Sequence, residues 1–368
     1  MDDKKTILVN PNWSYGGEGL FNRVWPPLSL AYCASLSTQS GRETLLVDAN
    51  ARKLTPKQTD LETREAGLVF ITSSTLDKWQ CPHFNTDFIK EYIHHQRESS
   101  PQAEIILMGV HGTVNPEWVF RELKPDYIIL GEPEACVKKI CMTGEVKQAP
   151  GIAFKADDGG MEVNEQEILP LDDFPLPAYQ LLDVKDYDYE VLGSRLAVLE
   201  GSRGCPYNCV FCLQKMFSGY RKKTPANLLG EIDYAVKEWG AETIYFMDLE
   251  FTINKDLVRE VSRHMVEMDY DVKWCCQTRA DSVDAETLSL MKEAGCKLIH
   301  YGVESGSERI QSQINKEISL EEIKRGVGLT KEAGIEAACF FMLGFPGETK
   351  KEMRETIKFA IELNPTYA

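Results

Sequence analysis

The first half of the chain alternates short apolar runs with longer segments of helical periodicity. These segments follow one another at residues 6–9, 28–36, 44–48, 67–73, 84–96, 105–108 and 127–130. Buried β-branched runs separated by helices are typical of a parallel sheet that carries helices on both faces. We therefore expect an α/β fold with a doubly wound, Rossmann-like domain over residues 1–145.

The second half repeats strand and helix in a more regular order. We expect strands at residues 196–199, 243–247, 272–276, 297–303 and 337–343, and helices at 228–239, 255–268, 285–294, 320–333 and 349–363. This repeat predicts a partial (β/α)6 barrel of the TIM type over residues 195–368, with its functional residues at the carboxyl ends of the strands.

A different pattern separates the two halves. Residues 151–163 predict a hairpin that turns at Asp157-Asp-Gly-Gly160, and residues 169–179 contain three prolines that disfavour a helix. Residues 146–194 are therefore interpreted as a hairpin and a proline-rich linker.

The most distinctive stretch is Gly201-Ser-Arg-Gly-Cys-Pro-Tyr-Asn-Cys-Val-Phe-Cys212, in which Cys205, Cys209 and Cys212 have the spacing C-x3-C-x2-C. A structural zinc needs a fourth ligand, and clusters of four irons usually take four cysteines. Because no fourth cysteine or histidine follows closely, we interpret the motif as a cluster held through three irons, with the fourth iron open to a ligand that is not protein. A redox cluster or an incomplete zinc knuckle is the alternative.

Composition narrows the classes of function. A formal charge of −16 argues against a general nucleic-acid binder, and we find neither the apolar region of a signal peptide nor an apolar run of membrane-spanning length. Eleven cysteines without such a signal predict thiols or metal ligands in a cytoplasmic protein. We interpret those outside the motif as buried small hydrophobic residues: Cys33, Cys81, Cys136, Cys141, Cys275, Cys276, Cys296 and Cys339.

Polar and charged residues follow every expected strand of the second half. They are the cysteine motif, Asp248-Leu-Glu250, Gln277-Thr-Arg-Ala-Asp281, Gly302-Val-Glu-Ser-Gly306 and Gly344-Phe-Pro-Gly-Glu348. The carboxyl ends of barrel strands form one mouth, so these segments predict a single site.

Together with the aromatic residue before its last cysteine, this arrangement resembles the radical S-adenosylmethionine superfamily. The resemblance implies a 4Fe-4S cluster on the three cysteines, with S-adenosylmethionine chelating the open iron. It implies cofactor contacts by Phe211 and by Gly344 and Pro346 near the adenine, Glu304 near the ribose, and Asp248 and Glu250 near the methionine amino group, although Asp248-Leu-Glu250 departs from the usual Gly-Gly-Glu or Asp-Asp form. No catalytic residue is assigned beyond these ligands.

Arg279 has two interpretations. Its guanidinium suits a bidentate salt bridge to the methionine carboxylate. The alternative is an ion pair at the rim of the barrel with Asp281 or Glu250.

Residues 5–142 resemble the cobalamin-binding domain that precedes many radical S-adenosylmethionine cores. The matching pieces are Trp25-Pro-Pro-Leu-Ser-Leu-Ala-Tyr32, Val47-Asp-Ala-Asn50, Ile71-Thr-Ser-Ser-Thr75, Gly109-Val-His-Gly-Thr113 and Ile129-Leu-Gly-Glu-Pro-Glu134. The resemblance implies cobalamin contacts by Ser73, Ser74, Thr75, Gly109, His111, Gly112, Gly131 and Glu132. The Asp-x-His-x-x-Gly motif that supplies histidine to cobalt in the mutases is absent. We therefore interpret His111, like His83, as a loop residue and not as a cobalt ligand.

A cobalamin domain before such a core resembles the class whose commonest reaction is methylation. We therefore expect a radical S-adenosylmethionine enzyme that methylates an unactivated carbon of a small-molecule substrate, with a reductase, flavodoxin or ferredoxin as electron donor. The alternatives are a cobalamin-dependent cyclase or rearrangement enzyme and a non-catalytic protein that binds cobalamin and the cluster.

We also expect the chain to stop before a sixth barrel strand. Residues 364–368 follow the last helix, and five strands would leave the fifth with an unpaired edge.

Overall fold

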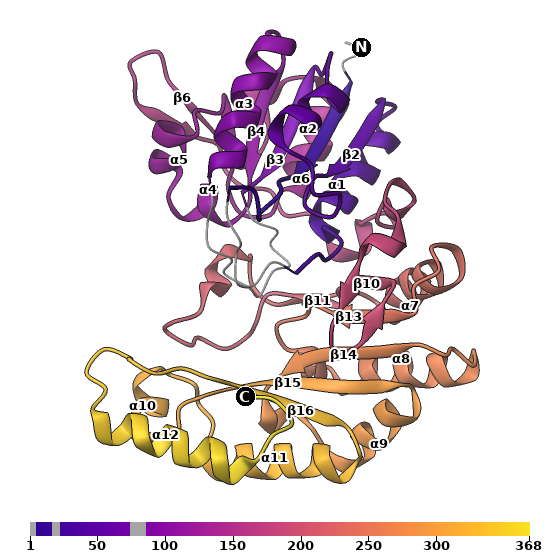
Figure 1. Cartoon of the computed structure of the whole chain (residues 1–368), viewed down its shortest axis with the longest axis vertical. Coiled ribbons are helices and arrows are strands. Elements are labelled where there is room, and N and C mark those ends of the chain that lie inside the picture. The colour runs from indigo at the N-terminus through magenta and orange to yellow at the C-terminus, as the bar shows by residue number, and fades with distance from the viewer. Residues whose placement is uncertain (1–4, 17–22, 74–85) are drawn as a thin grey trace. The chain divides into compact units, whose positions relative to one another are not determined.

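The computed structural model describes residues 5–16, 23–73 and 86–368. The chain divides into two compact units, Met1–Tyr189 and Glu190–Ala368 (Figure 1). Within the described residues no helix has both the length and the apolar character that crossing a bilayer requires.

The first unit contains a seven-stranded sheet in the order β2-β1-β3-β4-β5-β6-β7. Its strands are β1 (Thr6–Asn10), β2 (Thr44–Asp48), β3 (Leu68–Thr72), β4 (Glu104–Met108), β5 (Tyr127–Ile129), β6 (Ile152–Lys155) and β7 (Met161–Val163). The first five are parallel. The doubly wound parallel sheet expected from the apolar runs is therefore confirmed.

Helices cover this sheet. They are α1 (Leu28–Gln39), α2 (Pro56–Glu62), α3 (Asp87–Ser99), α4 (Val110–Val114), α5 (Pro116–Glu122) and α6 (Glu134–Thr143). One core cluster joins alternate residues of β1, β3 and β4 to apolar side chains of α3 and α5, while α1 packs beside α6. The strands read as continuous apolar runs because both of their faces are buried.

The expected hairpin forms, and it belongs to the first sheet. β6 pairs antiparallel with β5, and β7 pairs antiparallel with β6. The sequence places these residues in the linker because a hairpin pattern does not reveal its partner strand. Pairing with β5 covers an edge that would otherwise be exposed.

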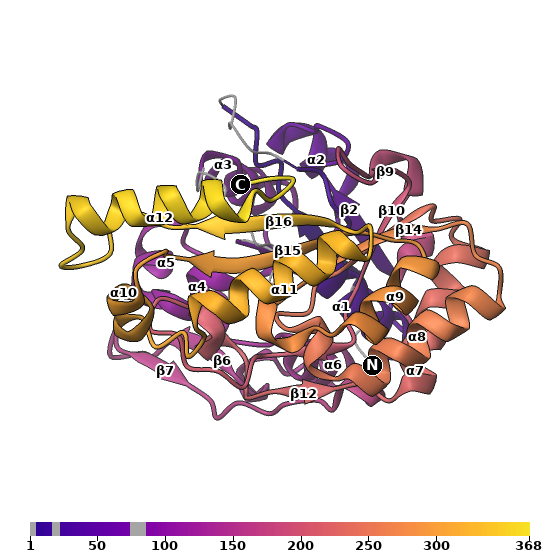
Figure 2. The same cartoon turned by 90° about the horizontal axis from the view of Figure 1, so that it is seen from below.

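The second unit contains a five-stranded parallel sheet in chain order: β10 (Leu196–Leu199), β13 (Thr243–Phe246), β14 (Lys273–Thr278), β15 (Cys296–Glu304) and β16 (Glu336–Phe341). Its helices are α7 (Pro225–Asp233), α8 (Lys255–Glu267), α9 (Ala285–Glu293), α10 (Glu308–Gln313), α11 (Leu320–Glu332) and α12 (Lys350–Leu363). Helices α8, α9 and α11 lie side by side on one face (Figure 2). The described strands do not close into a full barrel, as expected for a partial one.

The edge of β16 carries a short contact with the last residues of the chain. Helix α12 ends at Leu363, and Asn364 adopts a left-handed conformation before the proline. The backbone N–H of Thr366 then donates to the Ala337 carbonyl at 2.8 Å, and the N–H of Cys339 donates to the Tyr367 carbonyl at 2.9 Å. These bonds form a single parallel bridge.

Candidate functional site at the carboxyl ends of the strands

The three-cysteine segment is a loop closed at its base by two short strands. β11 (Ser202–Arg203) pairs antiparallel with β12 (Arg221–Lys222). Next to this ladder, Gly204 has φ +81°, and a Cβ at this position would lie 2.1 Å from the Gly219 carbonyl oxygen. Only glycine fits such a backbone contact without movement. The cysteine-bearing segment therefore begins and ends at fixed points.

Asp248 holds the start of this loop. Its fully buried carboxylate accepts the backbone N–H of Gly201 at 2.9 Å and the hydroxyl of Ser202 at 2.6 Å. Burial raises the pKa of Asp248 to about 6. These contacts make Asp248 a positioning residue for the cysteine loop, and its contact with the methionine amino group remains a prediction.

The three cysteines are partly exposed and lie close together. Burial raises the pKa of the Cys205 thiol to about 12, and the neighbouring thiols of Cys212 and Cys209 contribute to this rise. Among the described residues, no three Cys, His, Asp or Glu side chains converge as the ligands of a single metal ion do. A four-iron cluster does not require such convergence, since each thiolate binds a different iron. The donor set therefore fits a cluster better than a zinc ion.

Glu250 connects the ends of two strands. Its side chain is buried, and Oε2 accepts the backbone N–H of Arg279 at 2.8 Å and the hydroxyl of Thr278 at 3.2 Å. Burial raises the pKa of Glu250 to about 7. The carboxylate therefore lies at the site, as the sequence predicts, and also ties the end of β14 to the loop after β13.

Four of the five N–H donors of Arg279 have acceptors within the protein. Its Nε and Nη2 donate to Asp281 at 3.0 and 2.8 Å, Nη1 donates to the carbonyl of Lys316, and Nη2 donates to the carbonyl of Glu317 at 2.8 Å. The guanidinium also lies 3.9 Å from the ring centroid of Tyr207. The contacts favour the ion pair with Asp281 over the predicted salt bridge to a methionine carboxylate, because a bidentate pair needs two N–H donors and only one is left.

Glu304 ends β15 in an uncommon conformation. Its φ is +66°, and the register of β15 and β16 shifts between Gly302 and Glu304. Its Oε1 accepts a hydrogen bond from Nζ of Lys316 at 3.1 Å, in a buried ion pair. A Cβ on Gly302 would lie 2.6 Å from this Oε1. Such backbone strain and bulges gather at functional sites, and here they direct a carboxylate at the end of the strand.

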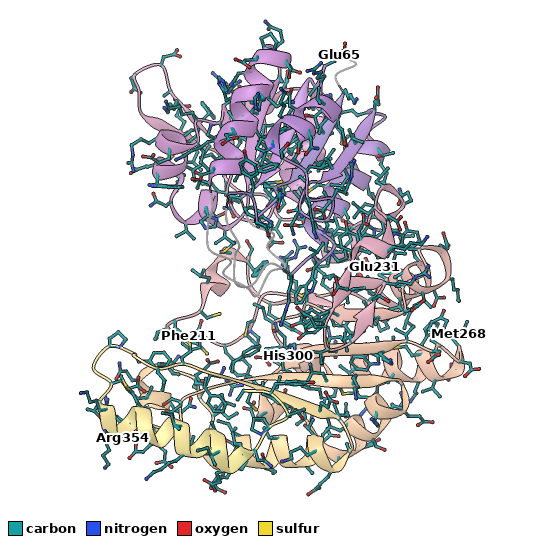
Figure 3. The ribbon with its side chains drawn as sticks, viewed as in Figure 1. Glu65, Phe211, Glu231, Met268, His300 and Arg354 are labelled. Atoms are coloured by element: carbon teal, nitrogen blue, oxygen red, sulfur yellow. The ribbon has the colours of Figure 1, made fainter. Side chains whose placement is uncertain are left out.

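Phe211 contacts the loop that follows β16. Its ring and that of Phe345 meet edge to face, with centroids 6.0 Å apart. Phe345 in turn packs against Ile310 and Ile314. The backbone N–H of Val210 donates to the carbonyl of Ile314 at 3.0 Å. Phe211, labelled in Figure 3, therefore lies beside the Gly344–Gly347 loop, as expected if both segments contact the adenine.

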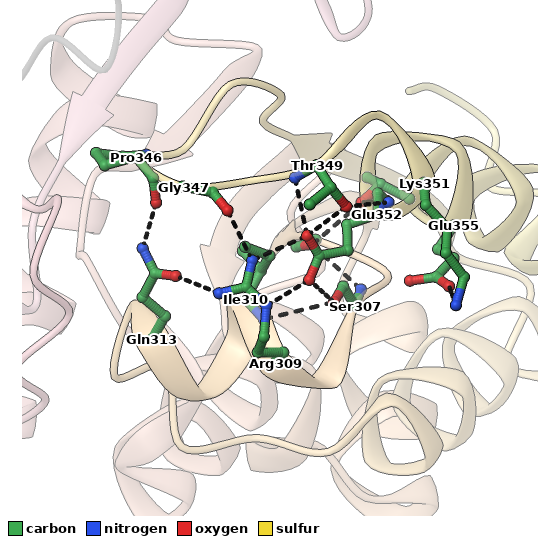
Figure 4. Close-up of polar contacts among 12 residues, drawn as sticks. Ser307, Arg309, Ile310, Gln313, Pro346, Gly347, Thr349, Lys351, Glu352 and Glu355 are labelled. Carbon is green, nitrogen blue, oxygen red and sulfur yellow. Dashed lines mark hydrogen bonds and ion pairs between the residues drawn. The ribbon is translucent and has the colours of Figure 1, made fainter.

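Side chains of α10 hold the Gly344–Gly347 loop (Figure 4). Gln313 Nε2 donates to the Pro346 carbonyl at 2.6 Å, and Arg309 Nη2 donates to the Gly347 carbonyl at 2.9 Å. Glu352 completes the arrangement by pairing with Arg309 at 2.6 Å. The loop conformation is thus set by residues outside it.

In the first unit, the predicted cobalamin residues lie at the ends of β3, β4 and β5. Ser73 is buried, and its hydroxyl has no hydrogen-bond partner among the described residues. The Nδ1 of His111 lies 3.1 Å from the Ser73 carbonyl oxygen, so Nδ1 carries the proton. Burial lowers the pKa of His111. Ser74 and Thr75, like Cys81 and His83, lie outside the described residues.

Glycines bring the backbone close at the same edge. Gly109 has φ +106° and Gly131 has φ +71°. A Cβ on Gly112 would lie 2.6 Å from Cγ2 of Ile128. Glu132 follows Gly131 and is buried. A buried hydroxyl beside glycine-lined backbone fits the polar periphery of a large ligand such as cobalamin.

The sequence reasoning missed Lys316, Arg309 and Gln313, which lie on α10 or in the segment after it. It searched the strand ends, where none of these residues occurs. One signal was present for Lys316, namely its place in Ile314-Asn-Lys-Glu-Ile318 between two apolar residues. The scattered cysteines that the structure describes are buried, as predicted: Cys33, Cys136, Cys141, Cys275, Cys276, Cys296 and Cys339.

Comparison with known proteins shows what the second unit and the whole chain are similar to. Residues 199–360 match the model of the radical SAM superfamily. An uncharacterized methyltransferase of Pyrococcus horikoshii is 29% identical, over 100% of this chain and 80% of its own length. The anaerobic magnesium-protoporphyrin IX monomethyl ester cyclase of Rubrivivax gelatinosus is 27% identical, over 99% of this chain and 67% of its own.

Two solved structures share the fold of both units. The cobalamin-dependent S-adenosylmethionine radical enzyme OxsB, with aqua-cobalamin and S-adenosylmethionine bound, matches 97% of this chain with a TM-score of 0.82 at 18% identity. This chain spans 52% of OxsB. The methyltransferase TsrM from Kitasatospora setae, with cobalamin and a [4Fe-4S] cluster bound, matches 99% of this chain and 71% of its own, with a TM-score of 0.76 at 19% identity. Residues 199–360 are therefore a radical S-adenosylmethionine domain, and the chain as a whole shares its fold with OxsB and TsrM.

Proposed function

We propose that this protein is a cobalamin-dependent radical S-adenosylmethionine enzyme that methylates an unactivated carbon of a small molecule. The observation that carries the proposal is the arrangement of the second unit. A loop with three cysteine thiols follows β10. The carboxylates of Glu250, in the loop after β13, and Glu304, at the end of β15, lie at the same edge of the sheet.

The residues have distinct parts in this proposal. Cys205, Cys209 and Cys212 hold a 4Fe-4S cluster, and Asp248 keeps the base of their loop in place through Gly201. When bound, the cluster, S-adenosylmethionine and cobalamin supply an electron, a 5′-deoxyadenosyl radical and a methyl group.

Other residues bind and orient the S-adenosylmethionine. Glu304 accepts hydrogen bonds from the ribose hydroxyls. Phe211 and the Gly344–Gly347 loop contact the adenine. The clamp of Arg309 and Gln313 on that loop keeps the adenine site formed before the ligand arrives. Such preorganisation lowers the ordering cost of binding.

Cobalamin is assigned to the first unit. Ser73, Gly109, His111, Gly112, Gly131 and Glu132 lie at the strand ends that carry ligands in doubly wound sheets. The buried hydroxyl of Ser73 is the best-placed donor, since it has no partner among the described residues.

A cyclase reaction is the second candidate. It is favoured by relatives that are named as magnesium-protoporphyrin IX monomethyl ester cyclases and that match 98–99% of this chain. Methylation is preferred for two reasons. A relative named as a methyltransferase matches 100% of this chain at 29% identity, and the methyltransferase TsrM shares the fold of both units. A protein that binds cobalamin and the cluster without catalysis is less favoured, because such a protein has no use for a preorganised adenine loop.

The cellular setting is part of the proposal. Buried thiols such as Cys136, Cys276 and Cys339 form no disulfide within the described residues. This favours a reducing compartment, and we assign the protein to the cytoplasm. A reductase, flavodoxin or ferredoxin would donate the electron.

The test uses the reconstituted protein with S-adenosylmethionine and dithionite under anaerobic conditions. We expect 5′-deoxyadenosine to form, and to form faster with the substrate. With S-adenosylmethionine labelled in its methyl group, transfer of the label to candidate substrates, measured by mass spectrometry, separates methylation from cyclisation. A protein that holds iron and cobalamin but forms no 5′-deoxyadenosine would refute the enzymatic proposal.

A further inference from the structure

Lys316 is a buried lysine beside the cysteine loop that the family resemblance did not identify. It lies between α10 and α11, and only 7% of the residue is exposed. Its Nζ donates to Glu304 at 3.1 Å and lies 5.9 Å from the ring centroid of Phe211. The side chain therefore lies among residues that the proposed function assigns to S-adenosylmethionine.

The ammonium group of Lys316 has unused hydrogen-bonding capacity. It has three N–H donors, and Glu304 is its one hydrogen-bond acceptor among the described residues. A buried cation with a single acceptor is costly unless further negative charge lies nearby. Burial raises the pKa of the Cys209 thiol and of Glu250, and the charge of Lys316 opposes both rises, so the ammonium group is near both side chains.

The surrounding backbone makes room for this lysine and holds it in place. A Cβ on Gly302 would lie 2.8 Å from Nζ, so the glycine leaves the space that the ammonium group occupies. The carbonyl of Lys316 accepts a hydrogen bond from Arg279, and the next carbonyl, that of Glu317, accepts another. Arg279 therefore fixes the segment from which the lysine extends.

S-adenosylmethionine brings a carboxylate into a site that already contains Glu250 and Glu304. A carboxylate in such surroundings needs a cation with free donors. Arg279 is occupied by Asp281 and by two carbonyl groups. We propose that Lys316 binds the methionine carboxylate of S-adenosylmethionine, and that Arg279 acts as a positioning residue through the backbone of Lys316. This inference rests on the proposed function and corrects the role expected for Arg279.

The test measures ligand binding to the reconstituted protein by isothermal titration calorimetry, without turnover. Lys316→Ala should raise the Kd for S-adenosylmethionine at least about tenfold, which corresponds to about 1.4 kcal/mol. Lys316→Arg should recover part of the affinity, because it restores a cation. Lys297→Ala, which removes a half-exposed lysine paired with Glu336, is the matched control and should change nothing.

A second ligand separates a direct contact from a structural role. Decarboxylated S-adenosylmethionine lacks the carboxylate, so the wild type and Lys316→Ala should bind it within about twofold of each other. If Lys316→Ala weakens both ligands equally, or neither, the inference is wrong. Iron content of each variant verifies that the cluster is present.

A double variant tests the role of Arg279. If Arg279 acts through Lys316, the variant that combines Arg279→Lys with Lys316→Ala should bind S-adenosylmethionine no more weakly than Lys316→Ala alone. Additive losses would show instead that Arg279 contacts the carboxylate itself. If the wild type with a full cluster binds no S-adenosylmethionine, the proposed function is wrong. The Lys316 assignment alone is wrong if the wild type binds the ligand and Lys316→Ala binds it equally well.

Discussion

The two parallel sheets of this protein end in chemically different loops. At the end of the first sheet, Ser73, Gly109, Gly112 and Gly131 are small and uncharged. At the end of the second, the residues that lie together are ionisable: Asp248, Glu250, Arg279, Glu304, Lys316 and three cysteines. The same architectural rule therefore produces one edge of mostly small, uncharged residues, called the neutral edge although Asp48, His111 and Glu132 also lie there, and one charged edge.

Each edge contains one buried aspartate whose carboxylate accepts hydrogen bonds from neighbouring segments. Asp48, at the end of β2, accepts the side-chain amide of Asn10 at 2.9 Å and the hydroxyl of Tyr187 at 3.0 Å. Asp248, after β13, accepts the N–H of Gly201 and the hydroxyl of Ser202. The aspartates organise loops in each unit, so the difference between the edges comes from the remaining residues. The neutral edge suits a large ligand held by shape and hydrogen bonds, and the charged edge suits a small zwitterion.

We expect the largest effect when one of the three cysteines of the charged edge is removed. Changing any one of Cys205, Cys209 or Cys212 to Ala should abolish the bound iron and the cluster absorbance, because two thiolates do not hold the cluster. Iron analysis and the visible spectrum after anaerobic purification measure this. Cys296→Ala and Cys339→Ala, which alter buried thiols elsewhere, should retain iron. Retention of a full cluster by Cys205→Ala would refute the assignment.

The next effect tests whether loop geometry matters apart from the ligands. Gly204→Ala should cost several kcal/mol and greatly reduce iron incorporation, because its Cβ would clash with the Gly219 carbonyl. Gly219→Ala is the matched control, since it has φ +74° and no atom within 4 Å of its Cβ. Its cost should be about 1–2 kcal/mol, from the left-handed conformation alone. Equal iron content in the two variants would show that the base of the loop is unimportant.

A smaller effect concerns the dependence of stability on pH. The pKa of Asp248 is about 6 in the folded protein against 3.8 as its ordinary value, so between these values the folded state binds more protons than the unfolded state. Stability of the cluster-free protein should therefore fall as the pH rises from about 4 to about 6, by on the order of 2–3 kcal/mol. Chemical denaturation across this range measures the slope. Asp248→Asn should remove the part that Asp248 contributes, while the part from Glu250, whose pKa burial raises to about 7, should remain.

Asp284 provides the opposite case for comparison. Its pKa is lowered to about 2, with Lys255 as a partner, so its contribution to stability is lost as the pH falls. Asp284→Asn should leave the slope between pH 4 and 6 unchanged. If both variants alter that slope alike, Asp248 is not its source.

The smallest effect tests the neutral edge. We expect cobalamin to bind without a protein histidine on cobalt, so His111→Ala should leave the electron paramagnetic resonance spectrum of the cob(II)alamin state unchanged. Nitrogen superhyperfine splitting that is present in the wild type and vanishes in His111→Ala would overturn this prediction. Cobalamin content of the two proteins, measured by absorbance, shows whether the substitution altered binding as such.

The sequence by itself determined the strands of both sheets and predicted the cluster ligands, but it missed helices such as α2, α6 and α10. Periodicity placed the strands of both sheets within a few residues, because strands buried on both faces form unmistakable apolar runs. The spacing of Cys205, Cys209 and Cys212 predicts the cluster site, because ligands on one short loop are necessarily close together. Glu250 and Glu304 were predicted from their position after apolar runs, because the carboxyl ends of parallel strands share one edge.

Only the tertiary structure decided how the side chains are used. Arg279 and Lys316 are far apart in the sequence, and nothing in either segment shows that one holds the backbone of the other. The local pattern likewise predicts the hairpin of β6 and β7. It does not show that β6 pairs with β5, because that pairing depends on which edge of the sheet is open. Local patterns record burial and backbone conformation, whereas the pairing of donors with acceptors depends on which loops the fold brings together.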